Sequence, residues 1–228
     1  MRKSLIGTVF ILSCLGSDCS ARQPKPASPG TDSRVESTQE IDIEQLLLAE
    51  MNRLRAEPES FISVLKEYRS HFKGKKVFRP GEITLVTNEG VSAVDDAIDF
   101  LESAEPLPAL RLSAGMSKAA AVHVEDLGPK GKYGHYGTDG SSPSDRLKRY
   151  GQPKVGTAEN LGFGEPDGHR MVLMLLIDDG VPGRGHRKNM FNPKYKVVGI
   201  GCGNHLNYGY MCVIDFAGEF VETSGKKP

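Results

Sequence analysis

The order of the periodic segments along the chain constrains its fold more than any other feature of the sequence. Two short strand-like segments at 197–202 and 210–216 come last, joined by the Gly- and Asn-rich residues 203–209. Helices that precede paired strands predict an α+β fold, in which helices pack on a mostly antiparallel sheet. The helical spacing is seen in Ile43, Leu47, Met51 and Leu54; in Val91, Val94, Ile98 and Leu101; in Met116, Ala119, Ala120, His123 and Leu127; and in the apolar run 169–177.

Three polar residues are predicted to begin helices, and one glycine to end one. Asn88, Ser113 and Ser142 each precede a helical segment, and their side chains can accept hydrogen bonds from its first free N–H groups. Pro143 strengthens the last of these predictions, because proline suits the first position of a helix. Gly128 is predicted to supply the left-handed residue that ends the helix begun at Ser113.

The first residues have the order of a secretory leader. Arg2 and Lys3 precede the apolar run 5–15, and small residues follow at 17–21. A run of about 11 apolar residues is too short to span a bilayer as a mature helix. The alternative, a short buried first helix, is disfavoured because polar, Pro-rich sequence follows at once. The leader predicts a secreted or cell-envelope protein, periplasmic or extracellular.

Two processing sites remain open for this leader. Ile11-Leu12-Ser13-Cys14 resembles a bacterial lipobox, which would leave an acylated Cys14 as the anchor of a lipoprotein, whereas Cys19-Ser20-Ala21 is typical of an ordinary signal-peptidase site. We divide the chain into a leader at 1–21, a disordered Pro/Ser-rich linker at 22–40, a folded domain at 41–222 and a tail at 223–228. The charge balance of 29 Lys and Arg against 29 Asp and Glu argues against a nucleic-acid partner.

Cys202 and Cys212 lie in the two strand-like segments. If the hairpin is centred near Asn207, the two cysteines face each other across the strands at the separation that a disulfide requires. Export to an oxidising compartment would favour that pairing. Two unpaired core cysteines are the alternative.

Four short segments place a metal-binding or proton-transferring side chain beside glycine or turn residues. They are 134–146, 158–162, 178–180 and 184–190. Each segment alone has an ordinary explanation, such as an exposed histidine, a turn cap or a carboxylate at a helix end. In this order, however, they resemble the CAP superfamily, also called SCP/PR-1-like or cysteine-rich secretory proteins.

The most specific part of the resemblance is residues 134–146, Gly-His-Tyr-Gly-Thr-Asp-Gly-Ser-Ser-Pro-Ser-Asp-Arg, which look like the bacterial branch of that family. The resemblance extends from about 43 to 220 and includes the Asn52-x-x-Arg55 portion of the first helix. It implies an α-β-α sandwich with a mostly antiparallel central sheet, and an apparent insertion near 71–105 that begins with a basic, turn-rich stretch.

The resemblance also implies a cleft lined by two histidines and two acids, and it assigns them to His135, Glu159, Asp179 and His186. The fourth position is ambiguous, because the family usually has Trp in the preceding helix. This chain has no Trp, and Leu176 stands in that place. A shift of one residue would select Asp178 instead of Asp179.

Two imidazoles with two carboxylates suit a divalent cation such as Zn²⁺, with His135 and His186 as ligands and the acids as ligands or orienting groups. A metal-bound water could then be activated for hydrolysis with an acid as general base. The resemblance favours an exported, non-enzymatic binding module for a small lipid-like or sterol-like ligand, a cation or an extracellular protein partner. A metal-dependent, peptidase-like hydrolase using the same cleft is the alternative, and a structural or adhesive envelope protein is the third. Membrane contact would come only through an N-terminal lipid anchor.

Three other features are interpreted as structural. Gly199-x-Gly201-x-Gly203 lacks the following helix of a dinucleotide site. His123 lies on the apolar face of its helix and is predicted to be a core or cleft-edge residue. His205, in the hairpin connection, is predicted to be an exposed turn residue.

Overall fold

The computed structural model describes residues 42–82 and 84–223, and these residues form one compact unit. The predicted leader and the processing sites at Cys14 and Cys19 lie outside the described residues, so the division at 21, 40 and 222 stays a prediction. Within the described part, no helix combines the length and apolar character needed to cross a membrane.

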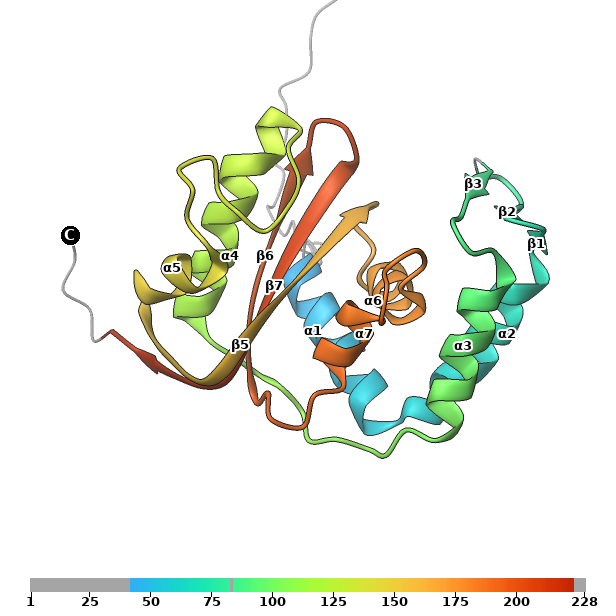
Figure 1. Cartoon of the computed structure of the whole chain (residues 1–228), viewed down its shortest axis with the longest axis horizontal. Helices are drawn as coiled ribbons and strands as arrows, with labels where there is room; N and C mark the ends of the chain where they lie inside the picture. The colour runs from blue at the N-terminus through green and yellow to red at the C-terminus, as the bar shows by residue number, and fades with distance from the viewer. Residues whose placement is uncertain (1–41, 83, 224–228) are drawn as a thin grey trace, which may run out of the picture. The chain divides into compact units, whose positions relative to one another are not determined.

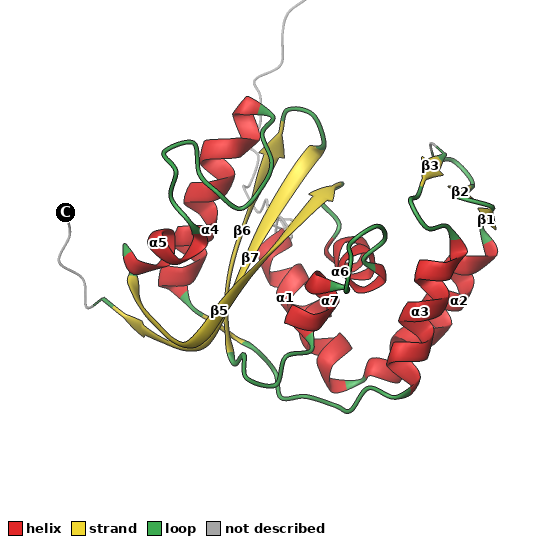
Figure 2. Cartoon of the chain, in the orientation of Figure 1, coloured by secondary structure: helices red, strands yellow, loops and turns green. Residues whose placement is uncertain are grey.

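The central sheet has four strands in the order β4-β6-β7-β5 (Figure 2). They are β4 (Arg111–Leu112), β5 (Gly151–Gly164), β6 (Val197–His205) and β7 (Gly209–Glu222). β4 runs parallel to β6, and the other two pairs are antiparallel. The prediction of a mostly antiparallel sheet is therefore confirmed, and β5 forms one edge of it.

Helices cover both faces of this sheet, as Figure 1 shows. One face carries α4 (Ala114–Leu127), followed by a short 3₁₀ turn (Gly128–Lys130), and α5 (Pro143–Lys148). The other face carries α1 (Ile43–Ala56), α6 (Gly168–Ile177) and α7 (Gly185–Met190). This is the predicted α-β-α sandwich.

The segment near 71–105 forms a separate layer beyond α6 (Figure 1). This layer combines α3 (Val91–Glu102) of that segment with α2 (Ile62–Ser70), which precedes the segment and follows a 3₁₀ turn (Pro58–Phe61). Between the two helices lies a small antiparallel sheet of β1 (Phe72–Lys73), β2 (Lys76–Val77) and β3 (Leu85–Val86). Buried Ala93, Val94, Ala97, Ile98 and Leu101 attach α3 to the core.

The glycines of β6 permit α4 to lie directly on the sheet. A Cβ atom on Gly199 would lie 2.2 Å from the backbone carbon of Met116, and one on Gly201 would lie 2.4 Å from the backbone nitrogen of Ala121. Both distances are far below van der Waals contact, so only glycine fits there. Gly199 and Gly201 therefore serve helix–sheet packing, as expected from the sequence.

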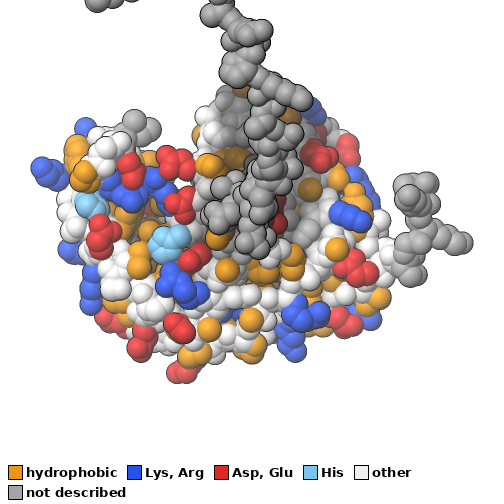
Figure 3. Space-filling view, turned by 180° about the vertical axis from the view of Figure 1, so that it is seen from behind, with side chains coloured by type: hydrophobic (Ala, Val, Ile, Leu, Met, Phe, Trp, Pro, Cys, Tyr) orange, Lys and Arg blue, Asp and Glu red, His pale blue; other side chains and the backbone are white. Residues whose placement is uncertain are grey.

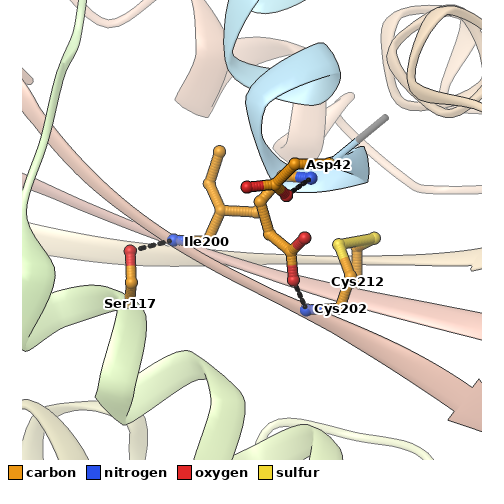
Figure 4. Close-up of a disulfide and its surroundings, with 6 residues drawn as sticks. Asp42, Ser117, Ile200, Cys202 and Cys212 are labelled. Carbon is orange, nitrogen blue, oxygen red and sulfur yellow. Dashed lines mark hydrogen bonds between the residues drawn. A yellow bond between two sulfur atoms is a disulfide. The ribbon is translucent and has the colours of Figure 1, made fainter. Parts of the chain in front are cut away.

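Cys202 and Cys212 form the predicted disulfide, with their Cα atoms 4.1 Å apart (Figure 4). The strand register pairs Cys202 with Cys212 and His205 with Gly209, so the hairpin is centred at Asn207, as predicted. Beyond short β4, side chains satisfy the free edge of β6. The N–H of Cys202 donates to Glu44 Oε1 at 2.9 Å, and that of Ile200 donates to Ser117 Oγ at 3.1 Å.

The family-like Asn52-x-x-Arg55 motif serves packing. Arg55 is buried, and its guanidinium donates to the carbonyls of Pro108 and Met190 at 3.0 and 2.5 Å. Asn52 exchanges two hydrogen bonds with the backbone of Leu110, at 3.1 and 2.7 Å. Both side chains therefore hold the segment before β4 against α1, because they satisfy backbone groups that the sheet leaves free.

Two of the predicted helix ends are wrong. Gly128 is helical, with φ −54°, and the left-handed residue is Gly131, with φ 61°. Gly128 is needed for a different reason, because a Cβ there would lie 2.4 Å from the carbonyl oxygen of Asn204. Gly90, rather than Asn88, precedes α3. Ser113 and Ser142 are confirmed as caps, since they accept from the N–H groups of Met116 and Asp145.

Candidate functional site

The first histidine–carboxylate pair joins the α4–α5 loop to β5. His135 Nδ1 lies 2.8 Å from Glu159 Oε1. The side chain of His135 is 49% exposed, whereas that of Glu159 is 2% exposed. The carboxylate is therefore enclosed by protein, and the imidazole it holds faces solvent.

Arg146 of α5 binds the same carboxylate from inside the protein. Its Nη2 forms an ion pair with Glu159 Oε2, and its Nη1 donates to the carbonyls of His135 and Ser141 at 3.0 and 3.1 Å. The arginine is 1% exposed, so charge neutralisation by Glu159 is essential to its burial. Arg146 closes the 134–146 motif, but the sequence analysis assigned it no role.

Asp215 of β7 lies directly across from Glu159 in the strand register. It is fully buried, and neither carboxylate oxygen has a hydrogen-bond partner among the described residues. Burial raises the pKa of Asp215 well above its usual value, and the neighbouring Glu159 carboxylate raises it further. Asp215 was not predicted as a site residue, although a single acid within the otherwise apolar stretch 211–217 is a signal for it.

The second pair is built at the junction of α6 and α7. Asp178 Oδ1 lies 2.6 Å from His186 Nδ1, and Oδ2 accepts the backbone N–H groups of His186 and Arg187 at 2.8 and 3.3 Å. Asp178 ends α6 in the left-handed conformation, with φ 57°, and its side chain is 1% exposed. One buried carboxylate thus orients the imidazole and caps α7.

The structure corrects the choice of Asp179 as the fourth residue. Its carboxylate accepts the backbone N–H groups of Asn88 and Glu89 at 2.6 and 2.8 Å, in the loop before α3. Asp178 contacts His186 instead. The left-handed turn at Asp178 reverses the chain direction, so the two neighbouring carboxylates point to different segments. Asp179 therefore holds the loop before α3, which belongs to the inserted layer, against the end of α6.

The two pairs meet at adjacent residues of β5, on its two faces. Glu159 points toward α5, and Asn160, its neighbour along the strand, points toward α7, because successive strand side chains alternate. Asn160 Nδ2 donates to the carbonyl of His186 at 3.1 Å, and Asn189 Nδ2 donates to Asn160 Oδ1 at 2.8 Å. In Figure 1, α5 and α7 accordingly lie on either side of β5. The edge strand is the physical link between the two imidazoles.

Both imidazoles present the same donor set. A carboxylate at Nδ1 favours the tautomer with the proton on Nδ1 and leaves the lone pair on Nε2, as in many metal-binding histidines. Among the described residues, Nε2 of His135 and of His186 has no hydrogen-bond partner. Within 42–82 and 84–223, no three His, Cys, Asp or Glu side chains form a group that could hold a metal. The described residues thus offer two separate imidazole donors, one on each side of β5, with the acids as orienting groups.

The model of the family described as CAP, cysteine-rich secretory protein family, matches residues 48–216 of this chain, well over half of its length. The chain belongs to the CAP family. The match includes all of the residues that form the two histidine–carboxylate pairs.

Individual relatives are distant from this CAP chain. Uncharacterized protein YkwD of Bacillus subtilis (strain 168) is 28% identical over 115 residues, which cover 49% of this chain and 43% of that protein. Among solved structures, an extracellular protein containing a SCP domain from Bacillus anthracis str. Ames is 19% identical, with a TM-score of 0.40, and covers 56% of this chain and 37% of that one. An outer surface protein from Borrelia burgdorferi is 22% identical, with a TM-score of 0.41, over 49% of this chain and 78% of that one. This chain therefore spans less than half of the YkwD protein.

Two further histidines of the CAP domain are buried. His123 lies in the core, as predicted, and its Nε2 lies 2.9 Å from the carbonyl of Gly134, beside His135. Burial lowers its pKa, which favours the neutral ring. The prediction for His205 is wrong: it is 2% exposed, with Nε2 2.8 Å from the carbonyl of Lys132. β6 extends to His205, so this residue belongs to the strand rather than to the turn.

Proposed function

We propose that this chain is an exported, non-enzymatic CAP-domain binding module, in which His135 and His186 contact the ligand. One observation carries the proposal: both site carboxylates are buried and fully engaged. Glu159 holds His135 and Arg146, while Asp178 holds the ring and backbone of His186. Neither acid is free to remove a proton from a water, and each imidazole keeps an Nε2 atom without a hydrogen-bond partner among the described residues.

A divalent cation such as Zn²⁺ is the ligand that these atoms suit best. His135 and His186 would bind it through Nε2, and Glu159 and Asp178 would keep each ring in the required tautomer. When bound, the cation would supply Lewis acidity and would increase the affinity for an anionic group of an extracellular partner. The protein itself would hold and orient the two rings.

A lipid-like ligand would occupy a different part of the domain. A pocket of about 580 Å³ lies between the small inserted sheet and the ends of β5, α6 and the β6–β7 hairpin. Its volume is in the range of small-molecule sites. Figure 3 views the domain from behind, with a notch between the small-sheet end, on the left, and the centre. Its apolar lining consists of Leu85, Phe163, Met171, Met174 and Tyr208.

The location proposed for the protein is the cell surface or the extracellular space. The order of charged, apolar and small residues in 1–21 supports export, and two similar structures carry the words extracellular and outer surface in their descriptions. Attachment through an acylated Cys14 is one form of this proposal. Mass spectrometry of the N-terminus of the native protein tests it, because acylation and ordinary cleavage leave different masses.

Calorimetric titration of the purified protein with Zn²⁺ tests the cation site. We expect stoichiometric binding that falls at least ten-fold in His135→Ala and in His186→Ala. His169→Ala is a matched control, because His169 is also half-exposed with Nδ1 on a carboxylate, Glu50, at 3.2 Å, but it lies on α6. Equal loss in the control, or no binding by the wild type, would contradict the cation proposal.

The lipid site is tested with a fluorescent long-chain fatty acid and a fluorescent sterol. Leu85→Glu places a charge in the pocket, whereas Leu112→Glu, at a residue of matching exposure (40% and 39%), does not. Binding that is lost only in Leu85→Glu supports the proposal. Absence of any lipid or cation binding would instead favour a structural or adhesive envelope protein.

A metal-dependent hydrolase is the second candidate, favoured by the two accessible imidazoles. Activity on peptide and ester panels, measured with and without a chelator, separates it from the module. Turnover that a chelator abolishes, and that His135→Ala and His186→Ala remove, would replace the binding proposal with an enzymatic one. We expect no turnover.

A further inference from the structure

The small sheet of the inserted layer has two chemically different faces. Cross-strand partners share a face, so the register groups its residues: Phe72, Val77 and Leu85 on one side and Lys73, Lys76 and Val86 on the other. Val77 is buried, which marks the first face as the inner one. The second face is directed to solvent, because Lys73, Lys76 and Val86 are all exposed.

Two neighbours extend this outer face. Gly74 and Lys75 form the two-residue turn between β1 and β2. The carbonyl of Lys75 accepts the N–H and the hydroxyl of Thr87 at 2.8 and 2.9 Å. Phe78 is 43% exposed, and its ring centroid lies 5.7 Å from Lys73 Nζ. Val86 is 67% exposed. We call Lys73, Lys75, Lys76, Phe78 and Val86 the lysine face.

The positive charge of the lysine face is uncompensated, although the whole chain is neutral. Among the described residues, none of its three lysines forms an ion pair. Other basic residues near it already contact acids: Arg69 pairs with Asp95, Arg79 pairs with Glu82, and His71 Nε2 lies 2.6 Å from Glu67 Oε1. The acids nearby are thus already occupied, and the lysines remain free to bind an external anion.

We propose that the lysine face docks on the surface of an anionic phospholipid bilayer. The lysines would contact lipid phosphates, and Phe78 and Val86 would enter the boundary between headgroups and acyl chains. Figure 1 places the small sheet at the end of the α2–α3 layer, and in Figure 3 Lys and Arg side chains lie beside hydrophobic ones at that end. The site is independent of the two histidines and of the proposed cleft ligands.

The apolar side chains favour a bilayer over a soluble polyanion. A polyanion would use the lysines alone and would leave Phe78 and Val86 in water. A bilayer satisfies both kinds of group at once, because its anionic headgroups lie directly above an apolar phase. Insertion of Phe78 into an apolar phase therefore distinguishes a bilayer from a soluble polyanion as the binding partner.

The chain contains no Trp, so Phe78→Trp provides a single fluorescent reporter in the full-length protein. We expect its emission to shift to the blue with phosphatidylglycerol vesicles, to be quenched by brominated acyl chains, and to stay unchanged with phosphatidylcholine vesicles. Tyr133→Trp is the matched control, at a 72% exposed aromatic residue in the α4–α5 loop. Its emission should not shift.

A charge variant measures the electrostatic contribution. Lys73→Gln, Lys75→Gln and Lys76→Gln, combined with Phe78→Trp, should weaken vesicle binding on the order of a hundred-fold, since each lysine near an anionic surface contributes about five-fold. The control combines Phe78→Trp with Lys118→Gln, Lys132→Gln and Lys148→Gln, which remove the same charge elsewhere, and should leave binding within about two-fold.

Three results would overturn the proposal. One is an unchanged emission of the Phe78→Trp variant with anionic vesicles, even if residues 1–41 carry the protein to the membrane. Another is an equal loss of binding in the two lysine variants. The last is binding to soluble heparin or polyglutamate without any vesicle-dependent shift, which would assign the lysine face to a polyanion instead.

Discussion

The two histidine–carboxylate pairs have the same contact geometry but different construction. His186 and Asp178 are eight residues apart, and a single turn between two helices builds the pair. His135 and Glu159 are 24 residues apart, on a loop and a strand, and their carboxylate also neutralises buried Arg146. The first pair depends on local backbone conformation, whereas the second depends on a balance of buried charges.

This difference teaches where each pair is vulnerable. Removing the Asp178 carboxylate leaves two backbone N–H groups without a partner at the start of the short helix α7. Removing Glu159 leaves a charged guanidinium without its counter-ion inside the protein, which is a larger cost. The two pairs should therefore respond unequally to equivalent substitutions.

The largest effect is expected for Glu159→Ala. The free energy of unfolding should fall by about 3 to 5 kcal/mol, because Arg146 remains buried and unpaired. Urea unfolding at pH 7 measures the loss. The double variant Glu159→Leu with Arg146→Met should recover most of it. A double variant as unstable as Glu159→Ala would mean that the pair does not act through charge.

A smaller loss, about 2 to 3 kcal/mol, is expected for Asp178→Ala, because two backbone N–H groups and the His186 ring lose their acceptor. Asp179→Ala is the adjacent control, which releases only the Asn88–Glu89 loop and should cost about 1 kcal/mol. The same urea measurement compares them. A greater loss at Asp179 would reverse the assignment of the two acids.

The two pairs should also respond differently to pH, because among the described residues only the first pair has a further buried acid, Asp215, beside it. The folded pKa of Asp215 is raised, so its contribution to stability is fully present below the unfolded value of 3.8 and is lost as the pH rises through the folded pKa. Asp215→Asn should therefore stabilise the protein at pH 7 and have little effect near pH 3.

Asp139→Asn is the control of opposite sign. Hydrogen bonds from Ser141 and the nearby Arg149 lower the pKa of exposed Asp139, so its stabilising contribution is present above the unfolded value and is lost as the pH falls. This variant should be less stable than the wild type at neutral pH and equal to it in acid. A difference in stability between Asp215→Asn and the wild type that does not change with pH would contradict the raised pKa of Asp215.

The smallest effect is expected at the link between the pairs. Asn189→Ala removes the 2.8 Å bond to Asn160 and should cost about 1 kcal/mol. Because Asn160 also donates to the carbonyl of His186, the NMR resonances of His186 should shift more than those of His135. Equal shifts in both rings would show that the two faces of β5 are more tightly coupled than these contacts indicate.

Much of the fold was predictable from local patterns. The apolar spacing of Ile43 to Leu54 predicted α1, and Ser113 and Ser142 were correctly predicted as helix caps. These signals could be recognised because they depend only on neighbours along the chain. The Cys202–Cys212 disulfide followed from a hairpin centred at Asn207. His135, Glu159 and His186 were selected by resemblance to the family rather than by physical necessity.

The errors share a physical cause. Asp178 and Asp179 were indistinguishable by type, and a single left-handed residue decided which carboxylate meets His186. Asn88 looks like a cap, but Asp179, 91 residues away, accepts its N–H. His205 is buried because β6 continues two residues beyond Gly203 and meets Lys132. In each case a distant partner, absent from the local pattern, set the outcome.

The sequence by itself determined α1, α3, α4, α5 and α6, the hairpin register and the family resemblance, since periodicity, caps and motifs act over a few residues. Only the tertiary structure decided that Glu159, Arg146 and Asp215 share one buried cluster, and that the two imidazoles lie on opposite faces of β5. The physical reason is that burial and strand pairing join residues that are far apart in the chain. The energy of a buried charge depends on those partners rather than on its neighbours in sequence.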